Sequence, residues 1–288
     1  MNIIRLLPLL LINFFVYTQE NNTQPNFLFI LVDDLPHDAN GFSGRYPFLK
    51  TPNIDRLANE GVNVTLLARN ENALQEVLKE LPQNGNQNHS YLVADFSKPS
   101  SVKEVILTNN NFHILINNTG GPKSGSILEA TPEQFSDAFQ MHVMVNQILV
   151  QAVVPFMKSE KFGRIINIIS TSVKEPIPGL GVSNTIRNAV ANWAKTMAEE
   201  LAAFGITMNN VLPGFTDTAR LDQIIKIKAT RANTSIEEMT QIMKGYVPAK
   251  RFAKPEETAN AVIFLASSAA SYITGINLPV DGGRTKSL

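Results

Sequence analysis

Short apolar runs alternate with longer amphipathic segments over most of the chain, and this alternation restricts the fold more than any other feature. The short runs are rich in Ile, Val, Leu and Phe, as buried strands are, and the longer segments have a helical period. Strands that are apolar along their whole length belong in parallel sheets covered on both faces. The pattern therefore predicts an α/β fold with a doubly wound parallel sheet.

The predicted elements follow the order of a three-layer, Rossmann-like arrangement, in which ligands bind at the carboxyl ends of the strands. The strands are expected at residues 27–34, 62–69, 90–95, 113–118, 164–170, 206–213 and 276–283. The helices are expected near residues 52–60, 71–81, 99–107, 131–158, 184–204 and 255–268. An insertion at residues 215–252 contains two short amphipathic helices, and it is either a lid over the substrate or a helical addition packed on the domain.

Composition excludes several classes of function. The 288 residues suffice for the core of one large domain. Lys and Arg total 25, and Asp and Glu also total 25, so the chain lacks the basic excess that binds nucleic acid. The absence of cysteine excludes disulfides, thiolate nucleophiles and zinc sites with Cys ligands.

The first residues have the layout of a secretory signal peptide, which is predicted for residues 1–19. Arg5 precedes an apolar run, after which the sequence becomes polar. That run is too short to span a membrane comfortably. A buried N-terminal strand or helix is the alternative, because the residues near Val16 make a poor cleavage site. The protein is expected to be secreted or periplasmic if the leader functions, and cytoplasmic otherwise.

Seven motifs follow one another from about residue 61 to the C-terminus: NVTLLARN, VADF, ILINNTGG, GRIINIIS, GITMNNVLPGFTDT, KRFAKPEETANAVIFLASSAASYITG and LPVDGG. In this order and spacing they resemble the short-chain dehydrogenase/reductase family, and most closely its 3-oxoacyl-[acyl-carrier-protein] reductase-like members. The resemblance implies a reductase-like domain at residues 62–288. It also implies an NADP-dependent oxidoreductase, with NAD less favoured, that acts on a small-molecule carbonyl, alcohol or acyl thioester.

The resemblance assigns the adenine end of the cofactor to the ends of two strands. Arg69 ends the second strand, where an acidic residue would bind the ribose of NAD, so a cation here favours the extra phosphate of NADP. Asp95 and the backbone of Phe96 match the position that contacts adenine. Without the resemblance, each residue has a structural alternative. Arg69 could be a solvated side chain at the end of a strand, and Asp95 could cap the next helix.

The same resemblance assigns the nicotinamide end of the cofactor. Asn117 and Gly120 of NNTGG match the motif that lines the cofactor cleft, although Asn117 could serve mainly to tie neighbouring strands together. Pro213 and Gly214 match the turn beside the nicotinamide, and Thr218 matches a residue that contacts its carboxamide. A simple tight turn is the alternative for these last residues.

The catalytic pattern of the family consists of a Tyr-x-x-x-Lys pair, an earlier Ser and an upstream Asn that holds a water. Ser170 keeps the Ser position, whereas Ser183 and Arg187 stand at the Tyr and Lys positions and His142 at the Asn position. An aliphatic hydroxyl is a far poorer acid than a phenol, and a guanidinium stays protonated. His142 is the nearby group whose ordinary pKa suits acid catalysis, with a packing role as the alternative. The combination of NNTGGP with Ser-x-x-x-Arg is similar to a branch of the family.

Residues 20–61 depart from the family, which has a strand and a glycine-rich phosphate loop there. They contain FILVDD and TPNIDRLANEGV, which resemble the N-terminus of the sulfatases, although the sulfatase nucleophile motif is missing. This resemblance implies a divalent cation on Asp33 and Asp34, with a polar strand end as the alternative. Two carboxylates would repel a pyrophosphate unless a cation lay between them. The stretch 119–126, TGGPKSGS, is not expected to replace the loop, because it does not lead straight into a helix.

Three functions stay open on the sequence. The first is an NADP-dependent oxidoreductase that uses Ser170, Ser183 and Arg187. The second is a non-catalytic, reductase-like scaffold or fusion that associates through the helices at 131–158 and 184–204, where a homo-oligomer contact is expected. The third is a secreted, metal-binding, sulfatase-like module.

Overall fold

The sheet has seven parallel strands in the order β3-β2-β1-β4-β5-β6-β7. A computed structural model describes residues 25–30, 62–81, 83 and 86–287. The strands are β1 (Asn26–Ile30), β2 (Asn63–Ala68), β3 (Ser90–Val93), β4 (Ile114–Asn117), β5 (Gly163–Ile168), β6 (Ile206–Pro213) and β7 (Asn277–Val280). The order reverses between β1 and β4, which is the switch point where open α/β sheets bind ligands. The predicted fold class is confirmed.

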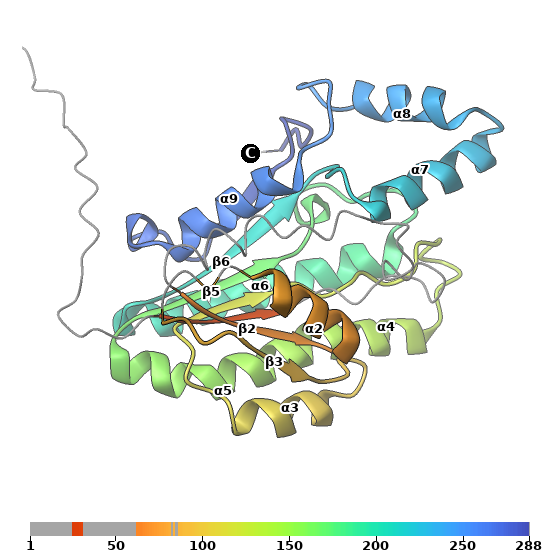
Figure 1. The fold of residues 1–288 in the computed structure, drawn as a ribbon. Coiled ribbons are helices and arrows are strands. Elements are labelled where there is room, and N and C mark those ends of the chain that lie inside the picture. The colour runs from red at the N-terminus through yellow and green to blue at the C-terminus, as the bar shows by residue number, and fades with distance from the viewer. Residues whose placement is uncertain (1–24, 31–61, 82, 84–85, 288) are drawn as a thin grey trace, which may run out of the picture.

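Helices cover both faces of this sheet (Figure 1). They are α2 (Glu71–Glu80), α3 (Pro99–Leu107), α4 (Pro132–Phe139), α5 (Val145–Glu160), α6 (Gly181–Leu201), α7 (Ala219–Ala232), α8 (Ile236–Gly245) and α9 (Pro255–Ala266). Helices α3, α5 and α6 pack on one face, and α2 and α9 pack on the other. Shorter helical turns are η2 (Gln140–Met144), η3 (Thr171–Val173), η4 (Ala202–Phe204) and η5 (Ser268–Ala270).

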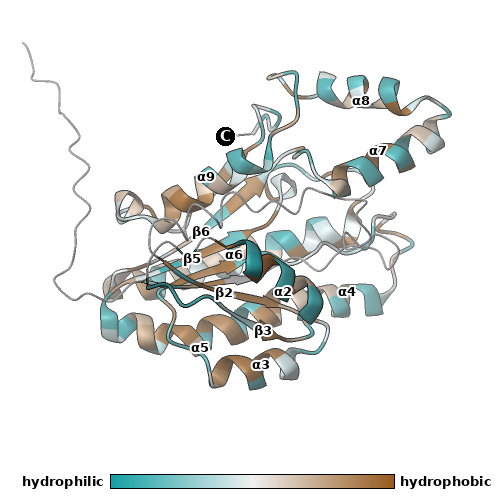
Figure 2. Ribbon diagram, in the orientation of Figure 1, coloured by the Kyte–Doolittle hydropathy of each residue, from teal (hydrophilic) through white to brown (hydrophobic). Residues whose placement is uncertain are grey.

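The core lies between the strands and these helices, as the predicted apolar runs require. Leu28, Leu67, Leu115 and Ile165 lie on neighbouring strands and are fully buried against α3, α5 and α6. Burial of one such side chain contributes about 1.5–3 kcal/mol. Figure 2 shows brown strands at the centre and teal on the outer surface of α2. The structure therefore confirms the prediction, made from the apolar strands, that helices cover both faces of the sheet.

The insertion contains the two predicted helices, α7 and α8, which project from the rest of the domain (Figure 1). They pack on each other through a small cluster of their own, made by Leu221, Ile225, Ala229, Met239 and Met243. Such an arrangement suits a lid, but that role stays a prediction.

Two histidines accept hydrogen bonds at the amino ends of neighbouring strands. The N–H of Asn26 at the start of β1 donates to His113 Nδ1 over 3.1 Å. The N–H of Val64 in β2 donates to His89 Nδ1, also over 3.1 Å. Burial lowers the pKa of His113, against a smaller opposing effect of Glu160. In both contacts Nδ1 is the acceptor, so the hydrogen bonds fix the orientation of the two rings.

Several predicted boundaries differ from the structure. The helix expected at 131–158 is three pieces, α4, the π-helical turn η2 and α5, and the helix expected at 184–204 begins at Gly181. By length and composition alone, Pro132–Glu160 could cross a membrane, but its apolar face packs in the core, as core helices of this composition do. The predicted helix at 52–60, and Asp33 and Asp34, lie outside the described residues.

Candidate functional site

A row of asparagines crosses four neighbouring strands, from the last residue of β4 to the first residue of β7. Asn117 donates to Asn167, Asn167 donates to Asn210 and Asn210 donates to Asn277, each over 2.8 Å. The strand register places these residues opposite one another. At the β4 end of the row, Asn117 Oδ1 is buried and has no hydrogen-bond partner among the described residues. Asn117 therefore ties β4 to β5, which is the role given above as the alternative to lining the cofactor cleft.

Arg187 joins helix α6 to the ends of two strands. Its Nη2 donates to the carbonyl of Thr119, which follows β4, over 3.0 Å. Its Nη1 donates to the carbonyl of Ile168, the last residue of β5, over 3.3 Å. The side chain is only 7% exposed. A guanidinium suits this place because its planar fork can donate to two fixed acceptors at once, which the single ammonium of Lys does less well.

His142 lies beneath the same loop, in the π-helical turn η2. Its Nδ1 lies 2.6 Å from the hydroxyl oxygen of Thr119, while Nε2 is buried without a partner in the described part of the chain. Burial, followed by the charge of Arg187, lowers the pKa of His142 to about 2. The expectation that its pKa suits acid catalysis is therefore wrong, since the ring stays neutral at physiological pH and holds no extra proton to donate.

Ser170 and Ser183 lie on elements that pack together. Ser170 follows β5 and begins η3, where its hydroxyl oxygen accepts from the N–H of Ser172 over 3.0 Å. Ser183 is buried on α6, one turn before Arg187, and α6 packs on η3. Asn188 of α6 also donates to the carbonyl of Ser172, which fixes the two elements against each other. The structure thus brings the predicted catalytic serines and Arg187 to the carboxyl end of β5.

Pro213 ends β6, and the chain then makes the predicted turn. The N–H of Gly214 donates to the carbonyl of Val280 over 2.9 Å. A Cβ on Gly214 would lie 2.7 Å from Asp281 Cα, so no larger residue fits without displacement of the backbone. Thr218 is exposed at the start of α7 and donates to the carbonyl of Thr216 over 3.3 Å. The turn is built as predicted, whereas its contact with a cofactor stays a prediction.

The predicted adenine-binding residues gather at the ends of the paired strands β2 and β3. Asp95 accepts from both the N–H and the hydroxyl of Ser97, over 3.0 and 2.7 Å. The hydroxyl bond, more than the charges of Lys98 and Arg69, lowers the pKa of Asp95 against an opposing effect of burial. Lys98 occupies the N-cap position of α3, so the alternative of an Asp95 helix cap is wrong. Phe96 is buried in the core beside them.

The glycine-rich stretch 119–126, which includes the half-buried Gly120, follows β4 and lies apart from the next helix. That helix, α4, begins only after Thr131, which forms a capping box with Gln134. The stretch therefore does not lead straight into a helix, as predicted. Among the described residues, no three His, Asp or Glu side chains form a group that could hold a metal ion.

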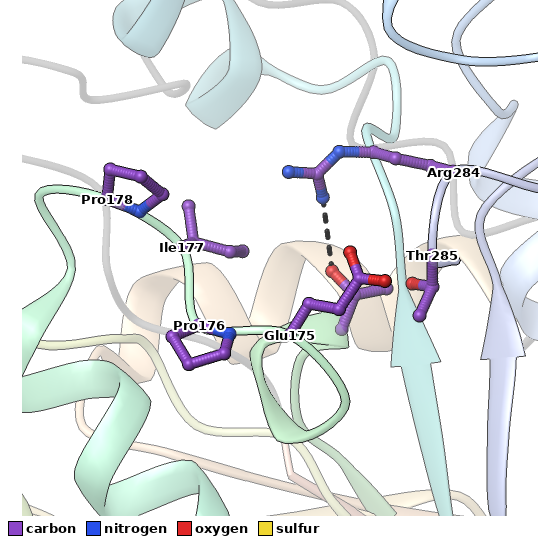
Figure 3. A pocket seen from close by; sticks show the side chains of 7 residues that line it. Glu175, Pro176, Ile177, Pro178, Arg284 and Thr285 are labelled. Carbon is purple, nitrogen blue, oxygen red and sulfur yellow. Dashed lines mark hydrogen bonds between the residues drawn. The ribbon is translucent and has the colours of Figure 1, made fainter. Parts of the chain in front are cut away.

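Sequence reasoning missed a cavity of about 200 Å³ that is lined in part by Thr171, the residue after Ser170 (Figure 3). It is lined by Thr171, Glu175, Pro176, Ile177, Pro178, Arg284 and Thr285. Arg284 and Thr285 of the C-terminal segment line this cavity together with residues 171–178, which are more than a hundred positions earlier in the sequence. Local sequence patterns do not predict a contact between such distant segments. Thr119 was missed for a similar reason, because its role depends on where His142 and Arg187 meet it.

Comparison with known proteins supports this description. Residues 54–285 match the family described as "Enoyl-(Acyl carrier protein) reductase". A diacetyl reductase [(S)-acetoin forming] from Staphylococcus epidermidis is 32% identical over 80% of this chain and 91% of the relative. The 3-oxoacyl-[acyl-carrier-protein] reductase FabG of the same species is 30% identical over 79% of this chain and 91% of the relative.

Solved structures agree with the sequence relatives. The L-sorbose reductase from Gluconobacter frateurii, complexed with NADPH and L-sorbose, matches with a TM-score of 0.79 and 25% identity, over 92% of this chain and 98% of the other. An NADPH-bound short-chain oxidoreductase from Pseudomonas aeruginosa, described as containing an atypical catalytic center, matches with a TM-score of 0.72 and 25% identity. That match covers 82% of this chain and 92% of the other.

Proposed function

Since the chain belongs to the short-chain dehydrogenase/reductase family, we propose that it is an NADPH-dependent oxidoreductase that reduces the carbonyl group of a small molecule. One observation carries this proposal. Ser183 and Arg187 lie one turn apart on the buried face of α6, and Arg187 is fastened to the end of β5 just before Ser170. The chain thus keeps an ordered set of polar groups at the carboxyl edge of the sheet, even though the Tyr and Lys of the family are replaced.

The residues around the predicted cofactor site fit NADP at its adenine end. Arg69 directly follows β2 with an exposed side chain, and its cation is suited to the extra phosphate of NADP. Asp95 and Phe96 lie at the end of the neighbouring strand β3, where the adenine is expected. At the other end, Pro213 and Gly214 form the turn after β6 where the nicotinamide is expected. When bound, NADPH would supply the hydride, and NADPH-containing relatives support this choice over NADH.

The chain's own groups would handle the substrate oxygen and its proton. The Ser170 hydroxyl, whose oxygen is already engaged as an acceptor, keeps its hydrogen for the substrate oxygen. Ser183 would give the proton, a step that an aliphatic hydroxyl performs poorly by itself. The nearby charge of Arg187 favours the anionic form of a hydroxyl, because an opposite charge lowers a pKa. Arg187 itself holds its place and does not release a proton.

Isothermal titration with NADPH and NADH tests the cofactor assignment. We expect NADPH to bind more tightly, and an Arg69→Glu variant to lose most of that preference. Lys103→Glu reverses an exposed cation on α3 and is the matched control, with little expected effect. The absence of binding heat with both cofactors would refute the proposal. Steady NADPH oxidation with a panel of small ketones and 3-oxoacyl thioesters then tests the reaction.

A second candidate, a reductase-like scaffold that forms homo-oligomers, is favoured by apolar side chains on the predicted contact helices. Phe139 and Met144 are 41% and 42% exposed, on α4 and in the turn that follows it. We propose that a second copy of the chain covers this part of the 131–158 segment, and that the helix at 184–204 joins the contact. Sedimentation velocity of the wild type and of Met144→Glu tests this, with a smaller particle expected for the variant.

We also propose the division predicted from the N-terminal sequence: a leader at 1–19, a sulfatase-like segment at 20–61 and the reductase domain at 62–288. Exact mass measurement of the protein from cell and extracellular fractions tests cleavage of the leader and hence a secreted or periplasmic location against a cytoplasmic one. A divalent cation on Asp33 and Asp34 would make the melting temperature depend on calcium. An unchanged melting temperature with chelator would remove that metal site.

A further inference from the structure

We propose that the cavity beside Arg284 is a subsite for a carboxylate, so that the substrates of this protein are short-chain oxo acids. The proposal rests on the proposed reductase function and names its substrate class. The cavity lies where such a subsite is needed. Thr171 lines it and directly follows Ser170, and Phe215, which packs against Arg284, directly follows Gly214. The cavity is thus reached from the residue after Ser170 directly, and from the residue after Gly214 through its contact with Arg284.

Arg284 is held in place by two contacts that leave part of its guanidinium available. Nη1 donates to the hydroxyl oxygen of Thr171 over 3.2 Å. Cζ lies 4.4 Å from the centroid of the Phe215 ring, a cation–π contact. The salt bridges within the described residues do not include Arg284. A half-buried, oriented guanidinium with unused donors is the geometry that binds a carboxylate through two parallel hydrogen bonds.

The acidic side chains of Asp281 and Glu175 hold the C-terminal segment in place. Asp281 accepts from the N–H groups of Gly283 and Thr285, over 3.0 and 2.8 Å. Glu175 Oε1 accepts from the N–H groups of Lys286 and Ser287, over 2.5 and 2.9 Å. These bonds hold the backbone on both sides of Arg284. The carboxylates therefore position the guanidinium without forming an ion pair with it.

The size and lining of the cavity restrict the rest of the ligand. Its volume of about 200 Å³ is below the roughly 300–1,000 Å³ of pockets for drug-sized molecules, so a long acyl chain does not fit inside. Pro176, Ile177 and Pro178 form an apolar wall opposite Arg284, and Glu175 lies between them (Figure 3). A few methylene groups against the prolines and a carboxylate at Arg284 would fill this space.

Reduction of levulinate, a short oxo acid, and of methyl levulinate by the full chain with NADPH tests the subsite. We expect the acid to have the lower KM. Arg284→Gln should raise the KM for the acid by about tenfold or more, as expected for loss of a charge-assisted contact, and leave the ester and NADPH binding unchanged. Lys286→Gln removes a neighbouring exposed cation that does not line the cavity, and should change the KM less than about twofold.

Glu175→Gln sharpens the test, because the amide oxygen can still accept the two backbone hydrogen bonds while the negative charge in the cavity is removed. We expect this variant to bind levulinate more tightly than the wild type. Equal KM values for acid and ester, unaffected by Arg284→Gln, would overturn the subsite and leave the reductase function intact. If neither compound is reduced, the reductase proposal fails for this substrate class, and saturation-transfer NMR of levulinate decides the subsite. Levulinate binding that is lost in Arg284→Gln would support the subsite. Levulinate binding that is the same in the wild type and in Arg284→Gln, or no binding to either protein, would overturn it.

Discussion

The buried imidazole of His142 makes the stability of this protein depend on acid in a way that one substitution should remove. In the folded protein its pKa falls from 6.5 to about 2, because burial and then the charge of Arg187 disfavour the protonated ring. The unfolded chain binds a proton below pH 6.5, whereas the folded protein does not until about pH 2. Above pH 6.5 the ring is neutral in both states, so His142 does not lower the free energy of unfolding. Below pH 6.5 the unfolded chain gains a proton that the folded protein does not, so the free energy of unfolding falls as the pH falls.

The size of the effect follows from linkage. Each pH unit inside the window corresponds to about 1.4 kcal/mol, so lowering the pH from 6.5 to 4.5 should cost about 2–3 kcal/mol of unfolding free energy through His142. His142→Asn removes the titrating group and places the residue type that the family pattern has there. All other titrating groups, His113 included, are present in both proteins. Their contributions to the change of unfolding free energy with pH therefore cancel when the two proteins are compared.

Urea unfolding of both proteins at pH 7.5 and 4.5, followed by far-ultraviolet circular dichroism, measures this difference. The wild type should lose about 2–3 kcal/mol more than His142→Asn between the two pH values. The variant can be less stable at pH 7.5 without affecting the comparison, since only the change with pH is used. Equal losses in the two proteins would refute the reasoning and show that the ring is hydrated or protonated in the folded state.

Other substitutions test separate parts of the structure. Gly214→Ala should destabilise by about 1–3 kcal/mol in urea titration, because its Cβ would lie 2.7 Å from Asp281 Cα. Leu149→Ala should cost about 2–5 kcal/mol in the same assay, since Leu149 is fully buried against the sheet, whereas truncation of the exposed Leu128 is the control with little effect. Thr119→Val should cost about 1–3 kcal/mol, because it leaves His142 Nδ1 buried without a partner while the carbonyl that Arg187 uses remains.

The main elements of the fold were predictable because they follow from local patterns. Helix α3 appears at residues 99–107 as predicted, since a proline at its start and an apolar stripe mark it in the sequence. The π-helical turn around His142 was not predictable, because no proline or glycine marks that interruption of the helix. The buried state of His142 likewise depends on packing by α6 and on the loop after β4.

The candidate site divides in the same way. Ser170, Ser183 and Arg187 were found through their spacing in a family pattern, and the structure brings their elements together. The place of Arg284 depends on Glu175 and the Phe215 ring, which are distant in sequence, as well as on the local Asp281, so the sequence alone could not reveal it. Residues 31–61, where the family has its phosphate loop and this chain departs from it, lie outside the described part, so the effect of that departure stays a prediction.

The four asparagines across β4, β5, β6 and β7 have one further consequence. Each of the three hydrogen bonds runs from an amide N–H on the β4 side to an amide oxygen on the β7 side, so the amide dipoles in the row point the same way. Hydrogen bonds aligned head to tail polarise one another. The row therefore acts as one extended dipole across half the sheet, with its partial negative end at Asn117 Oδ1. Any N–H or hydroxyl donor that reaches this end meets an acceptor strengthened by three bonds that it never touches.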